Sequence, residues 1–98
     1  MLNQVVLVGL LKKVAKLDDY FSSIEIEVVR SFKELKGGFK SDFLTIIVWK
    51  GIADSLLQDN IINSNISICG RLESDDKQIK IVAEKVDYVG RSLNFKGG

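Results

Sequence analysis

The sequence predicts a small all-β domain that contains one short helix. Apolar residues dominate one segment and alternate with charged residues in another, and both patterns are typical of strands. One stretch in the middle of the chain has helical spacing instead. The 98 residues suit a single domain with a small core, and 46% hydrophobic with 28% charged residues favour a folded chain over a disordered one.

Three strands are expected in the N-terminal half of the chain. Residues 4–11 are almost all apolar, which suits a strand buried on both faces. Residues 22–30 form a half-buried strand, because apolar and acidic residues alternate from Ile24 to Val28. A glycine-bearing connection over residues 35–40 precedes a third strand over about residues 42–49.

The C-terminal half begins with the helix, over residues 52–57, whose apolar residues share one face. Strands four and five are expected over residues 66–72 and 79–89, joined by a polar turn at residues 74–77. Three strands, a helix and two strands is the order of the OB-fold, a five-stranded Greek-key barrel with its helix between strands three and four. We expect residues 1–90 to form this domain and residues 91–98 to be a short flexible end.

The composition excludes several classes of function. With no histidine and one cysteine, the chain predicts neither an internal disulfide nor a Cys/His metal site. Cys69 lies between apolar residues and is expected to be a small core residue. No catalytic motif is present, so we expect no enzyme, no cofactor and no metal. No segment reaches the ~18 apolar residues of a membrane span and no secretory signal is present, which favours a cytoplasmic protein.

Several segments resemble one known family. Residues 3–9 (Asn-Gln-Val-Val-Leu-Val-Gly) are similar to the opening strand of the bacterial-type single-stranded DNA-binding (SSB) proteins, and residues 70–72 (Gly-Arg-Leu) to the step before their fifth strand. Residues 42–50 resemble their third strand and residues 82–86 their last. The resemblance spans roughly residues 3–89.

The resemblance implies an OB-fold that binds single-stranded DNA, stacking bases on aromatic rings and contacting phosphates with basic side chains. Phe32, Phe43 and Trp49 match the stacking positions of the family. Phe39, which lies between lysines in a glycine loop, is a further stacking candidate or a loop anchor.

Strand geometry places Phe43 and Trp49 on one face of the third strand, and Leu44, Ile46 and Val48 on the other. Periodicity alone leaves two interpretations open. Either the aromatic residues face solvent and stack on bases, or they belong to the core and the aliphatic residues face outward.

Basic residues are concentrated in the middle of the chain. Between Arg30 and Lys50 there are five basic and two acidic residues, a local net charge of +3, although the whole chain carries only +1. Arg71 is also the basic position of the family on strand four. The expected phosphate contacts are Arg30, Lys33, Lys36, Lys40, Lys50, Arg71, Lys12 and Lys13. Taken singly, each is also consistent with a solvated surface residue.

Strand one suggests an oligomer. Residues 5–8 are apolar at consecutive positions, and a small barrel has only one interior, so another surface must cover the second face. The resemblance implies dimer contacts through this strand and tetramers made of two dimers. We therefore expect a homotetramer, with a homodimer as second choice.

Two departures from the family stand out. The connection between strands four and five is short, about residues 73–78, and has no aromatic residue. The chain also lacks the flexible acidic tail that recruits replication and repair proteins, either because it is a shortened form or because it is a tail-less relative.

The expected function is nucleoid-associated protection of single-stranded DNA in replication, recombination or repair. Two alternatives remain open. One is a primosomal-accessory-type OB protein that acts in replication restart, and the other is a structural OB subunit that makes only protein contacts.

Overall fold

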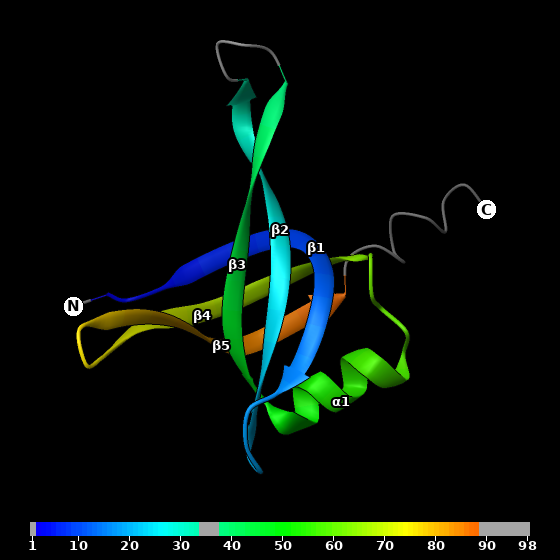
Figure 1. Ribbon diagram of the computed structural model, residues 1–98, viewed down its shortest axis with the longest axis vertical. Coiled ribbons are helices and arrows are strands. Elements are labelled where there is room, and N and C mark those ends of the chain that lie inside the picture. The colour runs from blue at the N-terminus through cyan, green and yellow to red at the C-terminus, as the bar shows by residue number, and fades with distance from the viewer. Residues whose placement is uncertain (1, 34–37, 89–98) are drawn as a thin grey trace.

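The computed structural model describes residues 2–33 and 38–88, with the backbone alone described for residues 31–33 and 39. Within these residues it contains five strands and one helix, in the predicted order. They are β1 (Val5–Lys16), β2 (Phe21–Lys33), β3 (Phe39–Trp49), α1 (Lys50–Gln58), β4 (Asn65–Asp75) and β5 (Gln78–Tyr88). The strands form a closed barrel in the order β1-β2-β3-β5-β4 (Figure 1). This is the OB-fold, and the fold prediction is confirmed.

The barrel closes through pairings between strands that are distant in sequence. β1 pairs antiparallel with β4 over residues 5–10. β3 pairs parallel with β5 at two positions, Ile46 with Ile81 and Ile47 with Val82. These two pairings bring the C-terminal hairpin onto the N-terminal three strands and so create one continuous outer surface.

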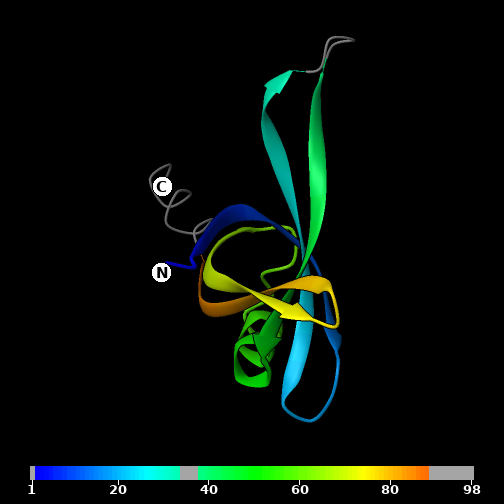
Figure 2. The ribbon, with the colours of Figure 1, turned by 90° about the vertical axis from the view of Figure 1, so that its left-hand side faces the viewer.

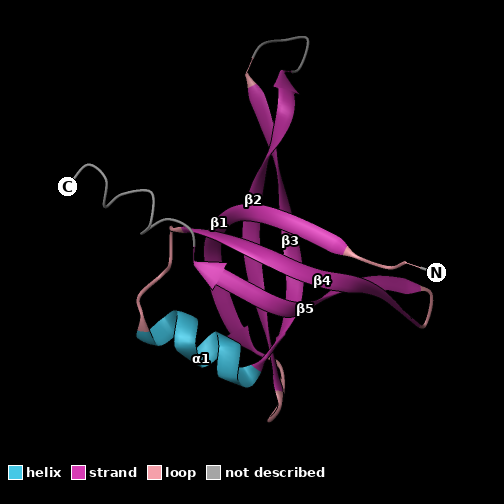
Figure 3. Ribbon diagram, turned by 180° about the vertical axis from the view of Figure 1, so that it is seen from behind, coloured by secondary structure: helices cyan, strands magenta, loops and turns pink. Residues whose placement is uncertain are grey.

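The core fills the barrel interior. Its fully buried side chains come from alternate positions on four strands: Leu11, Ile24, Ile26, Ile46, Val48, Ile66 and Ile68. α1 adds Ala53 and Leu56 and packs against one end of the barrel (Figure 3). Burying one aliphatic side chain of this size contributes about 1.5–3 kcal/mol, so the period-two apolar pattern of the strands stabilises the closed barrel directly.

β1 differs from the expectation in two ways. It continues to Lys16 because a β-bulge between Leu11 and Lys13 bends the strand, which passes from pairing with β4 to pairing with β2. The expectation that it is buried on both faces is wrong for the isolated chain. Val6 and Val8 are 62% and 55% exposed, since only the inward face of the strand reaches the single core.

The prediction that Cys69 is a core residue is wrong. It is half-buried and lies on the outer side of β4, opposite Val6 of β1, while Ile68 and Gly70 on either side of it are buried. The signal for this parity lies in the alternation along the strand, since polar Ser67 and Arg71 share the outward face with Cys69 while Ile66 faces inward. The immediate neighbours of Cys69 alone do not show it.

Two glycines lie where neighbouring strands approach closely. A Cβ on Gly9 would stand 2.7 Å from the carbonyl oxygen of Glu27, and a Cβ on Gly70 would collide with the carbonyl oxygen of Val82. Larger residues would therefore push β1 from β2 and β4 from β5. This gives a physical reason for the glycines in the two family-like segments.

β2 and β3 are both longer than predicted. They continue beyond the barrel as a twisted two-stranded arm, in which the last described pair is Lys33 with Phe39 (Figure 2). The pairing is irregular between Val29 and Lys33. The glycines of the connection suggested a loop from residue 35 to residue 40, but the ladder between the strands already includes Phe39.

β4 and β5 form a hairpin with a tighter turn than predicted. Asp76 and Lys77 alone connect the strands, with φ angles of 52° and 69°. Positive φ at both central residues is the feature of the turn that matches strand twist in a two-residue hairpin. The pairing therefore extends to Asp75 and Gln78, and the hairpin is a two-stranded ribbon at the side of the barrel.

Three further expectations concern the domain boundary, a membrane span and a metal site. The domain boundary predicted between residues 90 and 91 lies outside them. The helix in the described residues is neither long enough nor apolar enough to cross a membrane. The described part of the chain holds no group of three or more cysteine or carboxylate side chains suited to a metal ion.

Candidate nucleic-acid interface

A groove of about 500 Å³ crosses the outer surface of the barrel. Its floor is Ile47 of β3 and Val82 of β5, and its sides are the β1–β2 turn and the β4–β5 hairpin. The lining residues are Leu17, Asp18, Phe21, Ile47, Arg71, Glu73, Ser74, Asp75, Lys80 and Val82. OB-folds bind oligonucleotides on this face, between these two connections. We call this feature the barrel groove.

The β1–β2 turn brings an aromatic ring into the barrel groove. The Asp18 carboxylate accepts hydrogen bonds from the backbone N–H groups of Tyr20 (2.7 Å) and Phe21 (2.8 Å), and these bonds lower the pKa of Asp18. Phe21 is 41% exposed and pairs in register with Trp49. Phe21 was not among the predicted site residues. The signal for it is the pairing between the start of β2 and the end of β3.

Phe43 and Trp49 of β3 point outward. They are 58% and 61% exposed, whereas Ile46 and Val48 between them are fully buried. The predicted division of the strand faces is therefore observed, and the interpretation of the two aromatic residues as core is wrong. They lie about 20 Å apart along the strand, at ~3.3 Å per residue. Neither lines the barrel groove, but its floor residue Ile47 lies between them on the same strand face.

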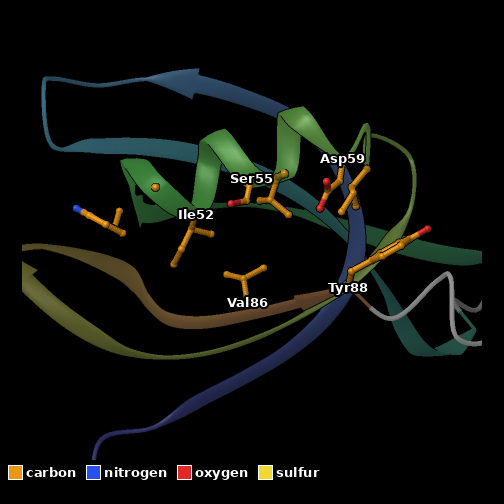
Figure 4. A pocket seen from close by; sticks show the side chains of 9 residues that line it. Ile52, Ser55, Asp59, Val86 and Tyr88 are labelled. Atoms are coloured by element: carbon orange, nitrogen blue, oxygen red, sulfur yellow. The ribbon is translucent and has the colours of Figure 1, made fainter.

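The ring of Trp49 is held where β3 meets α1. Trp49 is the N-cap residue of the helix and has an extended backbone, with φ −66° and ψ 145°. Its indole lies against Gly51, and a Cβ on that glycine would collide with three ring carbons. Trp49 also lines a second hollow of about 350 Å³ between α1 and β5, together with Ile52, Val86 and Tyr88 (Figure 4).

Lys50 stands beside these rings. It is exposed, and its backbone N–H donates to the carbonyl oxygen of Tyr20 (2.9 Å), a residue that is itself 71% exposed. Among the described residues Lys50 forms no ion pair. Tyr20, Phe21, Trp49 and Lys50 therefore gather beside the barrel groove, and we call this cluster the aromatic end.

The arm carries part of the predicted basic cluster. Arg30 donates two hydrogen bonds to Asp42, from Nε to Oδ2 (3.1 Å) and from Nη2 to Oδ1 (2.9 Å), which lower the pKa of Asp42. Lys40 is exposed. Four predicted site positions are not fully described. Only the backbone is described for Phe32, Lys33 and Phe39, and Lys36 lies outside the described residues. Their roles stay predictions.

The predicted lysines of β1 lie next to carboxylates of β2. Lys12 Nζ is 3.9 Å from Glu27 Oε1 and 3.4 Å from Asn63 Oδ1. Lys13 is exposed and pairs in register with Glu25. Because Glu25 and Glu27 stand between β1 and the outer face of β3, these lysines do not join the barrel groove.

Arg71 is the one predicted basic residue that lines the barrel groove among the described residues, and it is already bound to two carboxylates. Its Nε and Nη2 donate to Glu73 Oε2 at 2.9 Å and 2.5 Å, and its Nη1 donates to Glu84 Oε2 at 2.6 Å. These bonds raise the pKa of Arg71. Lys80 forms a similar pair with Asp75 (2.9 Å). We call this set of paired charges the hairpin side of the groove.

Comparison with known proteins gives relatives of one kind. No protein-family model matches the chain. Single-stranded DNA-binding protein 3 of Listeria innocua is 30% identical in an alignment of 112 positions, which covers all of this chain and 70% of the relative. Single-stranded DNA-binding protein 1 of Streptococcus pyogenes serotype M6 is 29% identical over 93 residues, which cover 86% of this chain and 71% of the relative.

Solved structures support the same fold. A small single-stranded DNA-binding protein from Mycoplasma pneumoniae has a TM-score of 0.66 and 24% identity, covering 88% of this chain and 92% of its own. A dimeric structure of the N-terminal domain of PriB protein from Thermoanaerobacter tencongensis has a TM-score of 0.57 and 22% identity, covering 89% of this chain and 96% of its own. These two likenesses show the fold alone. The identity and coverage of the Listeria relative go further, and they show that this chain belongs to the family of single-stranded DNA-binding proteins.

Proposed function

We propose that this chain binds single-stranded DNA without sequence preference, by stacking bases on exposed aromatic rings and contacting phosphates with basic side chains. The observation that carries the proposal is the exposure of Phe21, Phe43 and Trp49 along one outer surface of the barrel. Rings of this size are normally buried, and a row of them on one face marks a binding surface. Stacking on aromatic rings accepts every base, because each base has a π-face.

The proposed phosphate contacts come from exposed cations, of which Lys50 borders the rings. Lys50 at the aromatic end and Lys40 on the arm are both exposed, and Lys13 is exposed on β1. If about four to six phosphates are contacted, log K falls against log salt with a slope of about −3 to −4, at ~0.7 per contact for a single strand. Arg30 of β2 belongs to the same proposed set, as do Lys33 and Lys36 on the sequence prediction alone.

A salt series with fluorescently labelled oligo-dT tests the function. We expect tight binding at low salt, weakening along the stated slope, and weaker binding to a duplex of the same length. An affinity that does not change with salt would contradict the electrostatic part. Absence of binding at low salt would contradict the function and favour the structural OB subunit instead.

We further propose that the chain assembles as a homotetramer, with a homodimer as second choice. Val6 and Val8 of β1 are largely exposed, and Val29 of the adjacent β2 is 58% exposed on the isolated chain. A closed symmetric oligomer would cover these aliphatic side chains. One long strand could then contact several barrels, which raises its avidity.

Light scattering at micromolar concentration measures the assembly directly, against a monomer mass of 10.9 kDa. The double variant Val6→Asp and Val8→Asp should lower the measured mass, since it places two carboxylates in the covered surface. A wild-type mass equal to the monomer would contradict both oligomers.

The biological setting proposed is the cytoplasmic nucleoid, in replication, recombination or repair, with a binding role and no reaction. A primosomal-accessory role is the alternative, and the fold shared with a dimeric PriB domain is what favours it. A dimer that associates with a replicative helicase or its loader would support that alternative.

A further inference from the structure

The barrel groove holds two cations among its lining residues, and both are neutralised from within the chain. Arg71 is bound by Glu73 and Glu84, and Lys80 is bound by Asp75. Glu73 and Asp75 line the groove themselves. A phosphate that enters the groove therefore meets cations whose charge is already compensated by carboxylates and whose N–H donors are partly used.

The geometry at Arg71 is that of an occupied anion site. A guanidinium binds carboxylate or phosphate oxygens through neighbouring N–H groups, and the Nε and Nη2 pair is one such edge. Both groups on this edge donate to a single oxygen of Glu73, and Nη1 donates to Glu84. The carboxylates thus stand where phosphate oxygens would bind.

The backbone holds this arrangement in place. Arg71 and Glu73 lie two residues apart on β4, so their side chains share its outer face. Arg71 pairs in register with Val82, and Glu84 lies two residues further along β5. The two strands are joined by the two-residue turn at residues 76 and 77, so the three side chains cannot move apart without changing rotamers.

We propose that Glu73 and Glu84 act as internal competitors of DNA phosphate for Arg71, and so lower the affinity of the barrel groove for single-stranded DNA. This inference rests on the proposed function. An exposed ion pair contributes little, so exchange for a phosphate is feasible, and the carboxylates set the affinity of this site without closing it. The aromatic end, where Lys50 is not paired in this way, then determines where a strand is first held.

The test compares Glu73→Gln and Glu84→Gln with wild type, using labelled oligo-dT of about 15 nucleotides, near the upper site size of one OB barrel. Each variant should bind about two- to fivefold more tightly, which is the range of one exposed ion pair. Asp87→Asn is the matched control. It removes one carboxylate from β5 that pairs with Lys85 and does not line the barrel groove.

Removing any negative charge could raise the affinity for DNA in general. This general gain is distinguished from the release of Arg71 by repeating the substitutions in an Arg71→Met background. Direct repulsion between Glu73 and DNA is the same in both backgrounds, so it cancels in the double-mutant cycle. The gain should be larger when Arg71 is present. Equal gains in the two backgrounds, or a gain for Asp87→Asn as large as that for Glu73→Gln, overturn the inference.

Failure of DNA binding and failure of the competition at Arg71 give different results in these measurements. A wild-type protein that fails to bind oligo-dT removes the function itself. A wild-type protein that binds, with glutamine variants that bind no better, removes only the competition. Circular dichroism and thermal melting confirm that each variant is folded, and Glu73→Ala provides a second substitution if the amide finds a new partner.

Discussion

The two sides of the barrel groove differ in how much of their chemistry is already used within the chain. At the aromatic end, Phe21 and Trp49 are 41% and 61% exposed, and Lys50 has no ion pair in the described part of the chain. On the hairpin side, Arg71 and Lys80 are each held by carboxylates. The same surface therefore combines uncovered rings with compensated charges.

This difference indicates where the binding free energy comes from. A base that stacks on an exposed ring gains about 1–3 kcal/mol and displaces only water. A phosphate that approaches Arg71 must displace a carboxylate, so one ion pair is exchanged for another. We expect the aromatic end and Phe43 to dominate affinity, and the hairpin side to modulate it.

The largest expected effect tests whether the outward aromatic residues of β3 contribute to the stability of the core. Ile46→Ala, on the inward face of β3, should reduce the free energy of unfolding by about 2–5 kcal/mol, because it leaves a cavity in a packed interior. Phe43→Ala, on the outward face of the same strand, should change it by about 0.5 kcal/mol or less. Urea denaturation measures both. Equal losses would mean that Phe43 is a structural residue.

The aromatic rings themselves provide the next test. Trp49→Ala and Phe43→Ala should each weaken oligo-dT binding by about 1–3 kcal/mol, since each removes a stacking surface. Trp49 is the single tryptophan of the chain, so DNA should quench the fluorescence of the wild-type protein. Leu57→Ala is a suitable control, because Leu57 is 53% exposed on α1 and lines neither hollow. Fluorescence that stays constant at saturating DNA would remove Trp49 from the site.

A smaller loss of affinity for oligo-dT is expected from Gly51→Ala. Alanine favours the helix by about 1 kcal/mol over glycine, but its Cβ would occupy the space of the Trp49 ring. The fold should therefore remain stable while the ring moves, with a shifted emission maximum and an affinity between those of wild type and Trp49→Ala. Unchanged emission and affinity would show that the position of the ring does not depend on this glycine.

The hairpin side should respond less than the aromatic end. Arg71→Met is expected to weaken oligo-dT binding by less than about threefold, because the guanidinium is already neutralised and exposed charge pairs contribute little. Fluorescence anisotropy against the Trp49→Ala variant ranks the two. A larger loss for Arg71→Met would reverse the assignment of affinity between the two sides.

The smallest expected effect concerns the turn that presents Phe21. Backbone hydrogen bonds lower the pKa of Asp18 in the folded chain, so the ionised carboxylate stabilises the fold at neutral pH, and this contribution is lost as the pH falls through that lowered pKa. Asp18→Ala should therefore lower the melting temperature at pH 7, with a difference that shrinks in acid. Thermal melts of both proteins across the acid range measure it. A difference that is constant with pH would indicate a purely steric role.

The local pattern of residues predicted much of the fold and part of the site. Alternation along residues 22–30 and 42–49 separates inward from outward side chains without any knowledge of the neighbouring strands. The order of strands and helix was enough to predict the OB-fold. The exposure of Phe43 and Trp49 follows from the parity of one strand, once the aliphatic residues between them are assigned to the core.

What the sequence by itself determined is thus the order of the strands and helix and which faces are apolar, since both depend on short-range periodicity. Only the tertiary structure decided which residues meet. The pairing of Phe21 with Trp49 and the capture of Arg71 by Glu84 join different strands. The outward position of Cys69, by contrast, follows from the local alternation of Ile66 and Ile68 with Ser67 and Arg71 along β4. A side chain on a strand can face one of two ways, but its partners are chosen by strands that the chain brings alongside from elsewhere, and no local pattern encodes that choice.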